Sequence, residues 1–281
     1  MRVTLILLAL AGLSACDRQV QNEPAGEPAM PAALTYEGGD YKTDADKVAH
    51  GKRLADILDC TGCHGANLQG NNLADSPSDG AMYAPNITLV LAKYNEADFD
   101  RLIRHGEPRD GREFWFMPVE SYQFLSDADL AALLSYVRTF KPAGKPLPAF
   151  EKSKGLQRDI AAGQIGNAKV QIAKYRADQP VEMGETYSWG RYLAQTTCTA
   201  CHNNALQGWE GFTPDLDIAG AYSNGELTRL LTTGEGKSKK DLGMMSAVAR
   251  AHFSKLTPRE RAAVVGYVKV RADRPQPAQA H

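Results

Sequence analysis

Two short motifs in the chain carry residue types whose spacing supports a specific chemistry. The first motif consists of Cys60, Cys63 and His64. The second has the same Cys-x-x-Cys-His spacing and consists of Cys198, Cys201 and His202. Two thiols at this spacing can add to the two vinyl groups of a haem, while the adjacent imidazole binds the iron from one side. A zinc site would bring four ligands together, and a thioredoxin-like redox pair needs no following His. The motifs therefore predict two covalently attached haem c groups.

The opposite side of each iron needs a second ligand, and methionine suits this role because a soft thioether stabilises ferrous iron. Met117 lies 53 residues after His64, shortly before the end of the first segment. Met244 and Met245 hold the matching place in the second segment, and only one of them can bind an iron. Met82 comes too early in its segment to match and is expected to pack in the core.

Ligation by a second histidine is the competing scheme. The histidines available for it are His50, His105 and His252. His105 and His252 have no histidine at the matching place of the other segment, so a scheme shared by both segments favours methionine. The second ring nitrogen of each motif histidine should donate to a backbone carbonyl. Pro85 and Pro214 occupy equivalent places and are the expected acceptors.

An internal repeat surrounds the two motifs. A glycine leads into each motif, at Gly51 and Gly190, and a Gly-Glu pair follows later in each copy. Each copy then closes with an amphipathic helix whose start resembles a capping box. These boxes pair Ser126 with Asp129 and Thr257 with Glu260. The constant order indicates two copies of one helical unit.

Aromatic residues gather near both motifs and suit the dry walls of a haem site, although core packing explains each of them equally well. Those of the first copy are Tyr83, Phe114, Trp115, Phe116 and Tyr122. Those of the second copy are Trp189, Tyr192, Trp209, Phe212 and Tyr222.

The fold is predicted to be all-α, because no strand-like alternation of useful length appears in the sequence. With 281 residues the chain is long enough for two domains, each of which buries a core. We expect one haem domain at residues 45–148 and the other at 181–274, followed by a tail at 275–281. The polar stretch at 149–180 is the predicted connection between them.

The N-terminus has the features of an export signal. Arg2 precedes an apolar run that is too short to cross a bilayer permanently, so residues 1–15 are the predicted signal peptide. The signal ends at Cys16 in a sequence that resembles the bacterial lipobox, where the Cys is acylated; an ordinary secretory signal is the alternative. Asp17 resembles the mark of lipoproteins that stay in the inner membrane. Residues 16–44 are then a flexible, lipid-anchored tether on the periplasmic side of that membrane.

Composition argues against other functions. The formal net charge is −1 at pH 7, which offers no basic excess to neutralise nucleic-acid phosphates, so nucleic-acid binding is not expected. Of the five cysteines, Cys16 is assigned to the lipid anchor and the other four to the two motifs. No thiolate is left for another role.

From about residue 45 to 272 the chain resembles a tandem of class I cytochrome c domains. It is most similar to the cytochrome subunits and small dihaem cytochromes that accompany bacterial periplasmic dehydrogenases. Besides the two motifs, the matching segments are residues 85–88, 110–112 with Met117, and 243–248. In the family pattern of the last segment, the iron ligand maps to Met245. Asp215 departs from the pattern set by Asn86 in the first copy, which leaves the role of that loop open.

The resemblance implies an electron carrier with two six-coordinate haems. It would take electrons from a dehydrogenase or a quinol-oxidising complex and pass them to a soluble cytochrome or a terminal oxidase. A dihaem enzyme is the alternative, of the peroxidase or thiosulfate dehydrogenase type. Peroxidase chemistry needs an open axial position, and the thiosulfate enzymes use a Cys thiolate ligand that this chain cannot supply. A third possibility is a permanent cytochrome subunit of a dehydrogenase.

Overall fold

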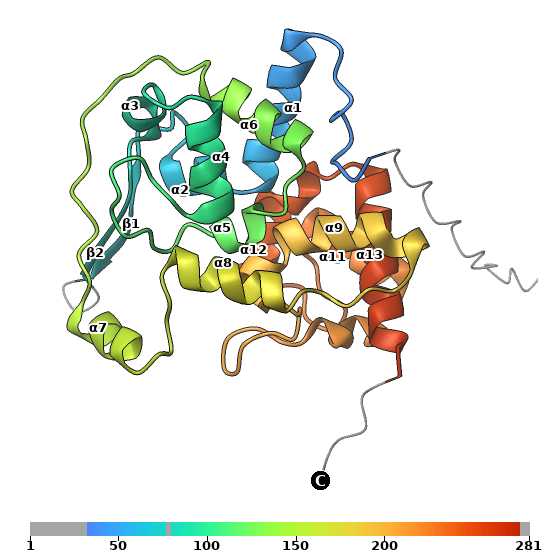
Figure 1. The fold of residues 1–281 in the computed structure, drawn as a ribbon. Helices are drawn as coiled ribbons and strands as arrows, with labels where there is room; N and C mark the ends of the chain where they lie inside the picture. The colour runs from blue at the N-terminus through green and yellow to red at the C-terminus, as the bar shows by residue number, and fades with distance from the viewer. Residues whose placement is uncertain (1–32, 77–79, 276–281) are drawn as a thin grey trace, which may run out of the picture.

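The computed structural model describes residues 33–76 and 80–275, and this part of the chain is mostly helical, as predicted (Figure 1). The predicted signal peptide, Cys16 and residues 16–32 of the predicted tether lie outside the described residues. None of the helices in the described part combines the length and the apolar character needed to cross a membrane.

The first unit of the repeat comprises six helices and one hairpin. Its elements are α1 (Asp44–Ile57), α2 (Cys60–His64), β1 (Asn71–Ser76), β2 (Gly80–Ala84), α3 (Ile87–Leu91), α4 (Glu96–His105), α5 (Val119–Tyr122) and α6 (Asp127–Val137). An antiparallel hairpin, β1–β2, is inserted into this otherwise helical unit. The motif histidine and the following proline are 21 residues apart here and 12 apart in the second unit, and the hairpin occupies this insertion. Its residues are mostly small or polar, so no apolar alternation marks it in the sequence.

The second unit repeats the same order without the hairpin. Its elements are η1 (Glu185–Tyr187), α9 (Ser188–Thr197), α10 (Thr199–His202), η2 (Leu216–Ala221), α11 (Asn224–Thr233), α12 (Met244–Ala251), η3 (Phe253–Lys255) and α13 (Pro258–Asp273). The stretch between the units forms α7 (Lys154–Ala161) and α8 (Ala168–Ala177). Ile172 and Tyr175 of α8 are buried, so this helix of the connection packs against the units.

In each unit the first helix crosses the closing helix at the glycine that leads into the motif. A Cβ on Gly51 of α1 would lie 1.9 Å from the carbonyl oxygen of Ala132 in α6. A Cβ on Gly190 of α9 would lie 2.1 Å from the carbonyl oxygen of Ala263 in α13. Only glycine allows the two backbones to approach this closely, and the repeat keeps it for that reason.

Replacing Gly51 by Ala should therefore destabilise the holoprotein by about 2–3 kcal/mol, because α1 and α6 must separate to admit the methyl group. Gly225→Ala is the matched control, since Gly225 also lies in a helix but has open space around its Cα. That change should be neutral or slightly stabilising. Thermal unfolding followed by circular dichroism measures both, and equal midpoints would contradict the crossing.

The closing helices begin as predicted, with one difference. Thr257 and Glu260 form the full capping box of α13. Ser126 accepts a hydrogen bond from the backbone N–H of Asp129, but the Asp129 carboxylate does not return one to Ser126. The Asp129 carboxylate instead accepts hydrogen bonds from His50 and from Tyr192 of the second unit, at 2.7 and 2.5 Å. A tertiary contact has replaced half of the predicted box.

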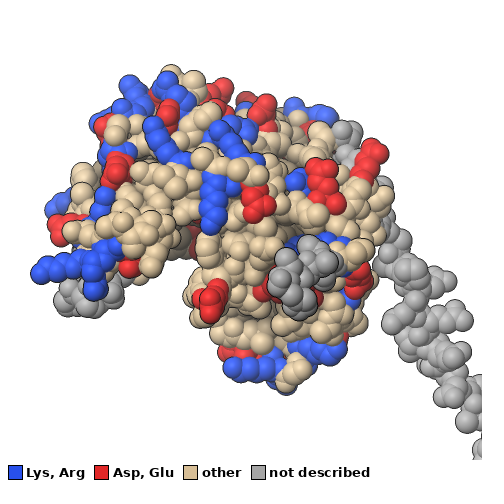
Figure 2. Space-filling model, turned by 60° about the horizontal axis from the view of Figure 1, so that its bottom comes forward, with Lys and Arg blue, Asp and Glu red and all other residues tan. Residues whose placement is uncertain are grey.

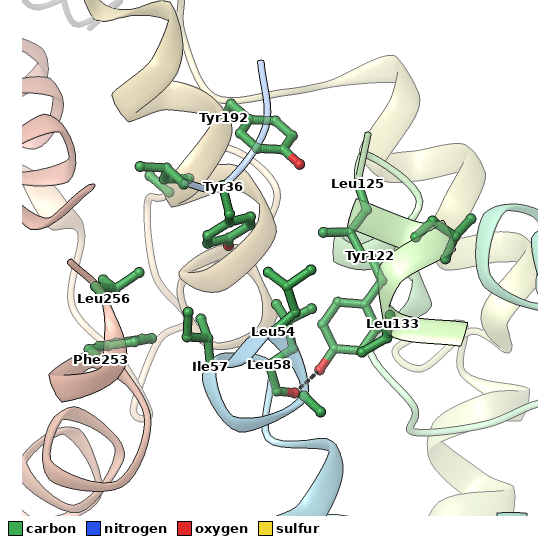
Figure 3. Packing of buried hydrophobic residues seen from close by; sticks show 14 of the residues in the cluster. Tyr36, Leu54, Ile57, Leu58, Tyr122, Leu125, Leu133, Tyr192, Phe253 and Leu256 are labelled. Atoms are coloured by element: carbon green, nitrogen blue, oxygen red, sulfur yellow. Dashed lines mark hydrogen bonds between the residues drawn. The ribbon is translucent and has the colours of Figure 1, made fainter. Parts of the chain in front are cut away.

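The described end of the predicted tether contains a residue that is packed into the core. Tyr36 is fully buried between the two units, in contrast to the expectation that the tether extends to residue 44. Figure 3 shows Tyr36 beside Tyr192, above Ile57 of α1 and opposite Leu256 of the second unit. One hydrophobic core thus runs through both units and includes the aromatic residue at the end of the tether.

Candidate haem sites

The first motif forms one wall of a largely apolar cavity. Cys60, Cys63 and His64 lie on α2, and Met117 borders the same cavity from the segment before α5. The cavity contains about 1200 Å³ of space between atoms, including its opening to solvent. Two thiols, an imidazole and a thioether around an apolar cavity fit a covalently bound haem. The structure thus brings the predicted residues of the first site together.

The aromatic residues near the two motifs take different places in the structure. All five aromatic residues expected at the first motif line its cavity. Tyr94, in the loop before α4, and Phe99 of α4 line it as well. In the second unit, Trp189 and Tyr192 pack between the units. Trp189 donates to the end of the predicted tether, and Tyr192 donates to Asp129 of the first unit. Phe212 and Trp209 are substantially exposed. Aromatic content alone did not distinguish a cofactor wall from a unit interface.

The second ring nitrogen of each motif histidine meets the predicted carbonyl. His64 Nδ1 lies 2.9 Å from the carbonyl oxygen of Pro85, and His202 Nδ1 lies 2.9 Å from that of Pro214. A carbonyl can only accept, so Nδ1 carries the proton and Nε2 keeps a free lone pair. Burial lowers the pKa of both histidines, which favours the neutral imidazole. Both rings are therefore prepared for iron at Nε2.

The four motif cysteines are partly buried and free of disulfides. Burial raises the pKa of Cys60 to about 12 and those of Cys63 and Cys198 to about 11. It also raises the pKa of Cys201. Protonated thiols are poor zinc ligands and slow redox nucleophiles. In the described part of the chain, no three His, Cys, Asp or Glu residues gather as a metal cluster.

The two candidate methionines of the second unit differ in burial. Met244 is 59% exposed, whereas Met245 packs partly buried against the core. Ser246 fixes this orientation, because its hydroxyl donates to the Gly234 carbonyl at 2.5 Å and accepts from Leu242 N–H at 2.8 Å. The geometry favours Met245, as the resemblance does.

The competing histidines have other partners or face solvent. His50 Nε2 lies 2.7 Å from the carboxylate of Asp129. His105 is exposed at the end of α4. His252 Nδ1 donates to the Asp56 carbonyl at 2.8 Å. None of the three borders the first cavity.

The departure at Asp215 has a structural reason. Asn86 caps α3 and donates its amide to the Ala143 carbonyl at 2.8 Å. Asp215 caps η2 in the same way, but its carboxylate also pairs at 2.9 Å with the fully buried guanidinium of Arg271. The loop keeps its capping role, and the added negative charge balances an arginine where the first unit has Phe140.

Each unit contacts the other unit inside or directly beside that unit's motif. Ser121 Oγ, just after the Met117 segment, lies 2.8 Å from the hydroxyl of Thr199, inside the second motif. In return, His252 bonds Asp56 and lies 3.3 Å from the carboxylate of Asp59, the residue before Cys60. Ser121 and His252 each stand five residues before the N-cap of the closing helix, so these contacts match each other in the repeat. No local sequence signal pointed to this arrangement.

Comparison with known proteins gives the class to which this fold and site belong. The family model for cytochrome c matches residues 48–141 and 188–271, and the chain therefore belongs to the cytochrome c family. This family carries covalently attached haem c, and the chain is an electron-transfer cytochrome.

Its relatives include subunits of dehydrogenases, among them two that are named as cytochrome subunits. A nicotinate dehydrogenase subunit of Pseudomonas putida is 29% identical and covers 68% of the chain. The fructose dehydrogenase cytochrome subunit of Gluconobacter japonicus is 26% identical, and the gluconate 2-dehydrogenase cytochrome c subunit of Pantoea cypripedii is 23% identical, each covering 79% of the chain. The chain spans 18%, 52% and 59% of these three proteins, respectively.

Proposed function

We propose that the protein is a dihaem cytochrome that carries single electrons from a dehydrogenase to a cytochrome or terminal oxidase. The observation that carries this proposal is the pair of matching motif sites, each with the same histidine–carbonyl geometry and each in contact with the other unit. Two separate sites, each beside a contact with the other unit, suit the passage of an electron through the molecule.

In this proposal, one haem binds at Cys60, Cys63, His64 and Met117. The other binds at Cys198, Cys201, His202 and Met245. Each haem, when bound, supplies an iron that changes its charge by one electron. The protein's residues orient the ligands and set the redox balance. The Pro85 and Pro214 carbonyls hold the imidazoles, and the methionine side chains favour the ferrous state. The apolar walls of the first site exclude water.

The relatives support a partner that is a dehydrogenase, because their names describe subunits of such complexes. We propose that this chain docks a dehydrogenase as a cytochrome subunit. Phe116 and Met244 directly precede the proposed iron ligands Met117 and Met245. They are 50% and 59% exposed and offer apolar contact points. Figure 2 shows acidic and basic side chains interspersed with uncharged surface on one face of the molecule, so docking there would not depend on a single sign of charge.

We further propose that Cys16 is acylated and holds the protein on the periplasmic side of the inner membrane. The support is the signal-like run before Cys16. With Cys16→Ser, the protein should leave the membrane fraction and appear in the periplasm. Membrane retention of this variant would show that another element holds it.

The experiment that tests the dihaem assignment is mass spectrometry of the periplasmically matured protein, combined with a reductive titration. The expected result is two haems per chain, taking up one electron each, with no rapid turnover of hydrogen peroxide or thiosulfate. One haem per chain would overturn the assignment of the second site. Fast turnover of either compound would favour an enzyme.

A further inference from the structure

The residues at the end of the predicted tether bond both units of the repeat. Thr35 Oγ1 donates to the Asp129 carboxylate at 2.7 Å, and Tyr36 N–H donates to the same carboxylate at 3.1 Å. On the other side, Trp189 Nε1 of the second unit donates to the Thr35 carbonyl at 2.9 Å. The Tyr36 hydroxyl lies 2.7 Å from the hydroxyl of Thr196, also in the second unit. We call residues 35–37 the clamp segment.

The third residue of the clamp segment completes a matching set of contacts at the second closing helix. Glu37 N–H donates to the Glu260 carboxylate at 2.8 Å, and Arg53 of the first unit donates to the Glu37 carbonyl at 2.5 Å. The clamp segment therefore uses the carboxylate at the start of each closing helix, Asp129 in one unit and Glu260 in the other.

These two carboxylates also join the units directly. Asp129 accepts from Tyr192 of the second unit at 2.5 Å, and Glu260 accepts from both terminal nitrogens of Arg53 of the first unit at 2.8 and 2.9 Å. Arg53 and Tyr192 each lie two residues after the glycine at the helix crossing, so the repeat relates the two cross-contacts. The clamp segment lies between this matched pair, with Tyr36 edge-on to Tyr192 at 5.8 Å between ring centroids (Figure 3).

Contacts of this kind decide whether two units move independently. Interfaces between domains of one chain permit relative motion unless they are large and hydrophobic. Here the hydrophobic core is continuous across the units, and Tyr36, with no exposed surface, contributes an aromatic side chain that belongs to neither of them. The buried polar atoms around Tyr36 form their hydrogen bonds in this one arrangement of the two units. A movement of one unit against the other would leave these atoms without partners.

We propose that the clamp segment positions the two motif sites at one fixed separation, so that the units behave as one rigid body. This inference rests on the proposed function, in which one iron is oxidised as the other takes up the same electron. Because such exchange weakens steeply with distance, a fixed separation makes its rate independent of domain motion. Tyr36 is a positioning residue for that exchange.

The test compares the holoprotein with Tyr36→Ser and with Tyr41→Ser. Tyr41 is the matched control, because its hydroxyl makes one long bond of 3.4 Å to the Ala128 carbonyl within the first unit. Calorimetry should give a single unfolding transition for the wild type and for Tyr41→Ser, and two transitions for Tyr36→Ser. A single transition for Tyr36→Ser at the midpoint of the control would overturn the clamp.

The second readout is redistribution of one photo-injected electron between the irons in solutions of increasing viscosity. In the wild type, the rate of redistribution should not change with viscosity. In Tyr36→Ser, the rate should fall severalfold as the viscosity increases. If Tyr36→Ser does not accumulate, Tyr36→Phe keeps the ring and loses only the bond to Thr196, so its transition should move down by about 2–4 °C. An unchanged midpoint for Tyr36→Phe would count against the clamp.

The two readouts separate the clamp from the proposed function. Absence of any electron redistribution in a wild-type protein that carries two haems would overturn the passage of electrons between the sites. Calorimetry would still decide whether residues 35–37 hold the units together, because it does not depend on redox activity.

Discussion

Replacing Met245 by Ala should lower the midpoint potential of one haem by roughly a hundred millivolts, within the ≈0.8 V range over which axial ligands set haem potentials. The thioether stabilises the ferrous state, so its loss favours the oxidised iron. The methionine-to-iron charge-transfer band of one haem should disappear as well. Spectroscopy and a redox titration of the same sample measure both effects.

Met244→Ala is an unusually close control for that change. It removes the same side chain from the adjacent residue, at the start of the same helix, but this side chain is 59% exposed. We expect an unchanged spectrum and unchanged potentials. If Met244→Ala removed the band and Met245→Ala did not, the assignment of the second ligand would be wrong, although the two attachment motifs would stand.

The sequence was sufficient wherever the determining contacts are local or repeated. The spacing within each motif fixes the thiols and the imidazole on one short helical turn, and this depends on few other residues. Gly51 and Gly190 could be matched because the crossing of the first and closing helices is the same in both units. The carbonyls of Pro85 and Pro214 followed from the same repeat, and both accept as expected.

The sequence was insufficient where a contact depends on how the two units are placed. Asp129 looked like a capping residue, and nothing near it in the chain indicates that Tyr192 and Tyr36 donate to it. Tyr36 looked like part of a Pro- and Ala-rich tether, since one aromatic residue has no periodicity. The contact between Ser121 and Thr199 joins residues 78 positions apart, and Thr199 stands at a position of its motif that the Cys-x-x-Cys-His spacing leaves open.

Asp129 is the position where this hidden interface should matter most for stability. Its buried carboxylate accepts from His50, Tyr192, Thr35 and the backbone of Tyr36. Asp129→Asn removes the charge and leaves some of these buried donors without an acceptor, which should cost about 3 kcal/mol at pH 7. Urea unfolding of the holoprotein measures this loss.

Asp127→Asn provides the comparison on the same turn of α6. The Asp127 side chain is fully exposed and pairs at 2.7 Å with Arg104, a solvent-screened contact that should add little to stability. A loss for Asp129→Asn no larger than that for Asp127→Asn would mean that the carboxylate does not hold the interface.

The pH dependence of the Asp129→Asn effect identifies the ionised carboxylate as its cause. Burial alone would raise the pKa of Asp129, but the hydrogen bonds from His50, Tyr192, Thr35 and Tyr36 outweigh it and hold the pKa below its usual value. A lowered native pKa means that the stabilisation is fully present above the unfolded-state pKa of about 3.9 and is lost as the pH falls through the native value. The difference in unfolding free energy between wild type and Asp129→Asn should therefore be constant near neutral pH and shrink below about pH 4. A difference that stayed constant into that acid range would show that packing, and not the charge of Asp129, joins the two units.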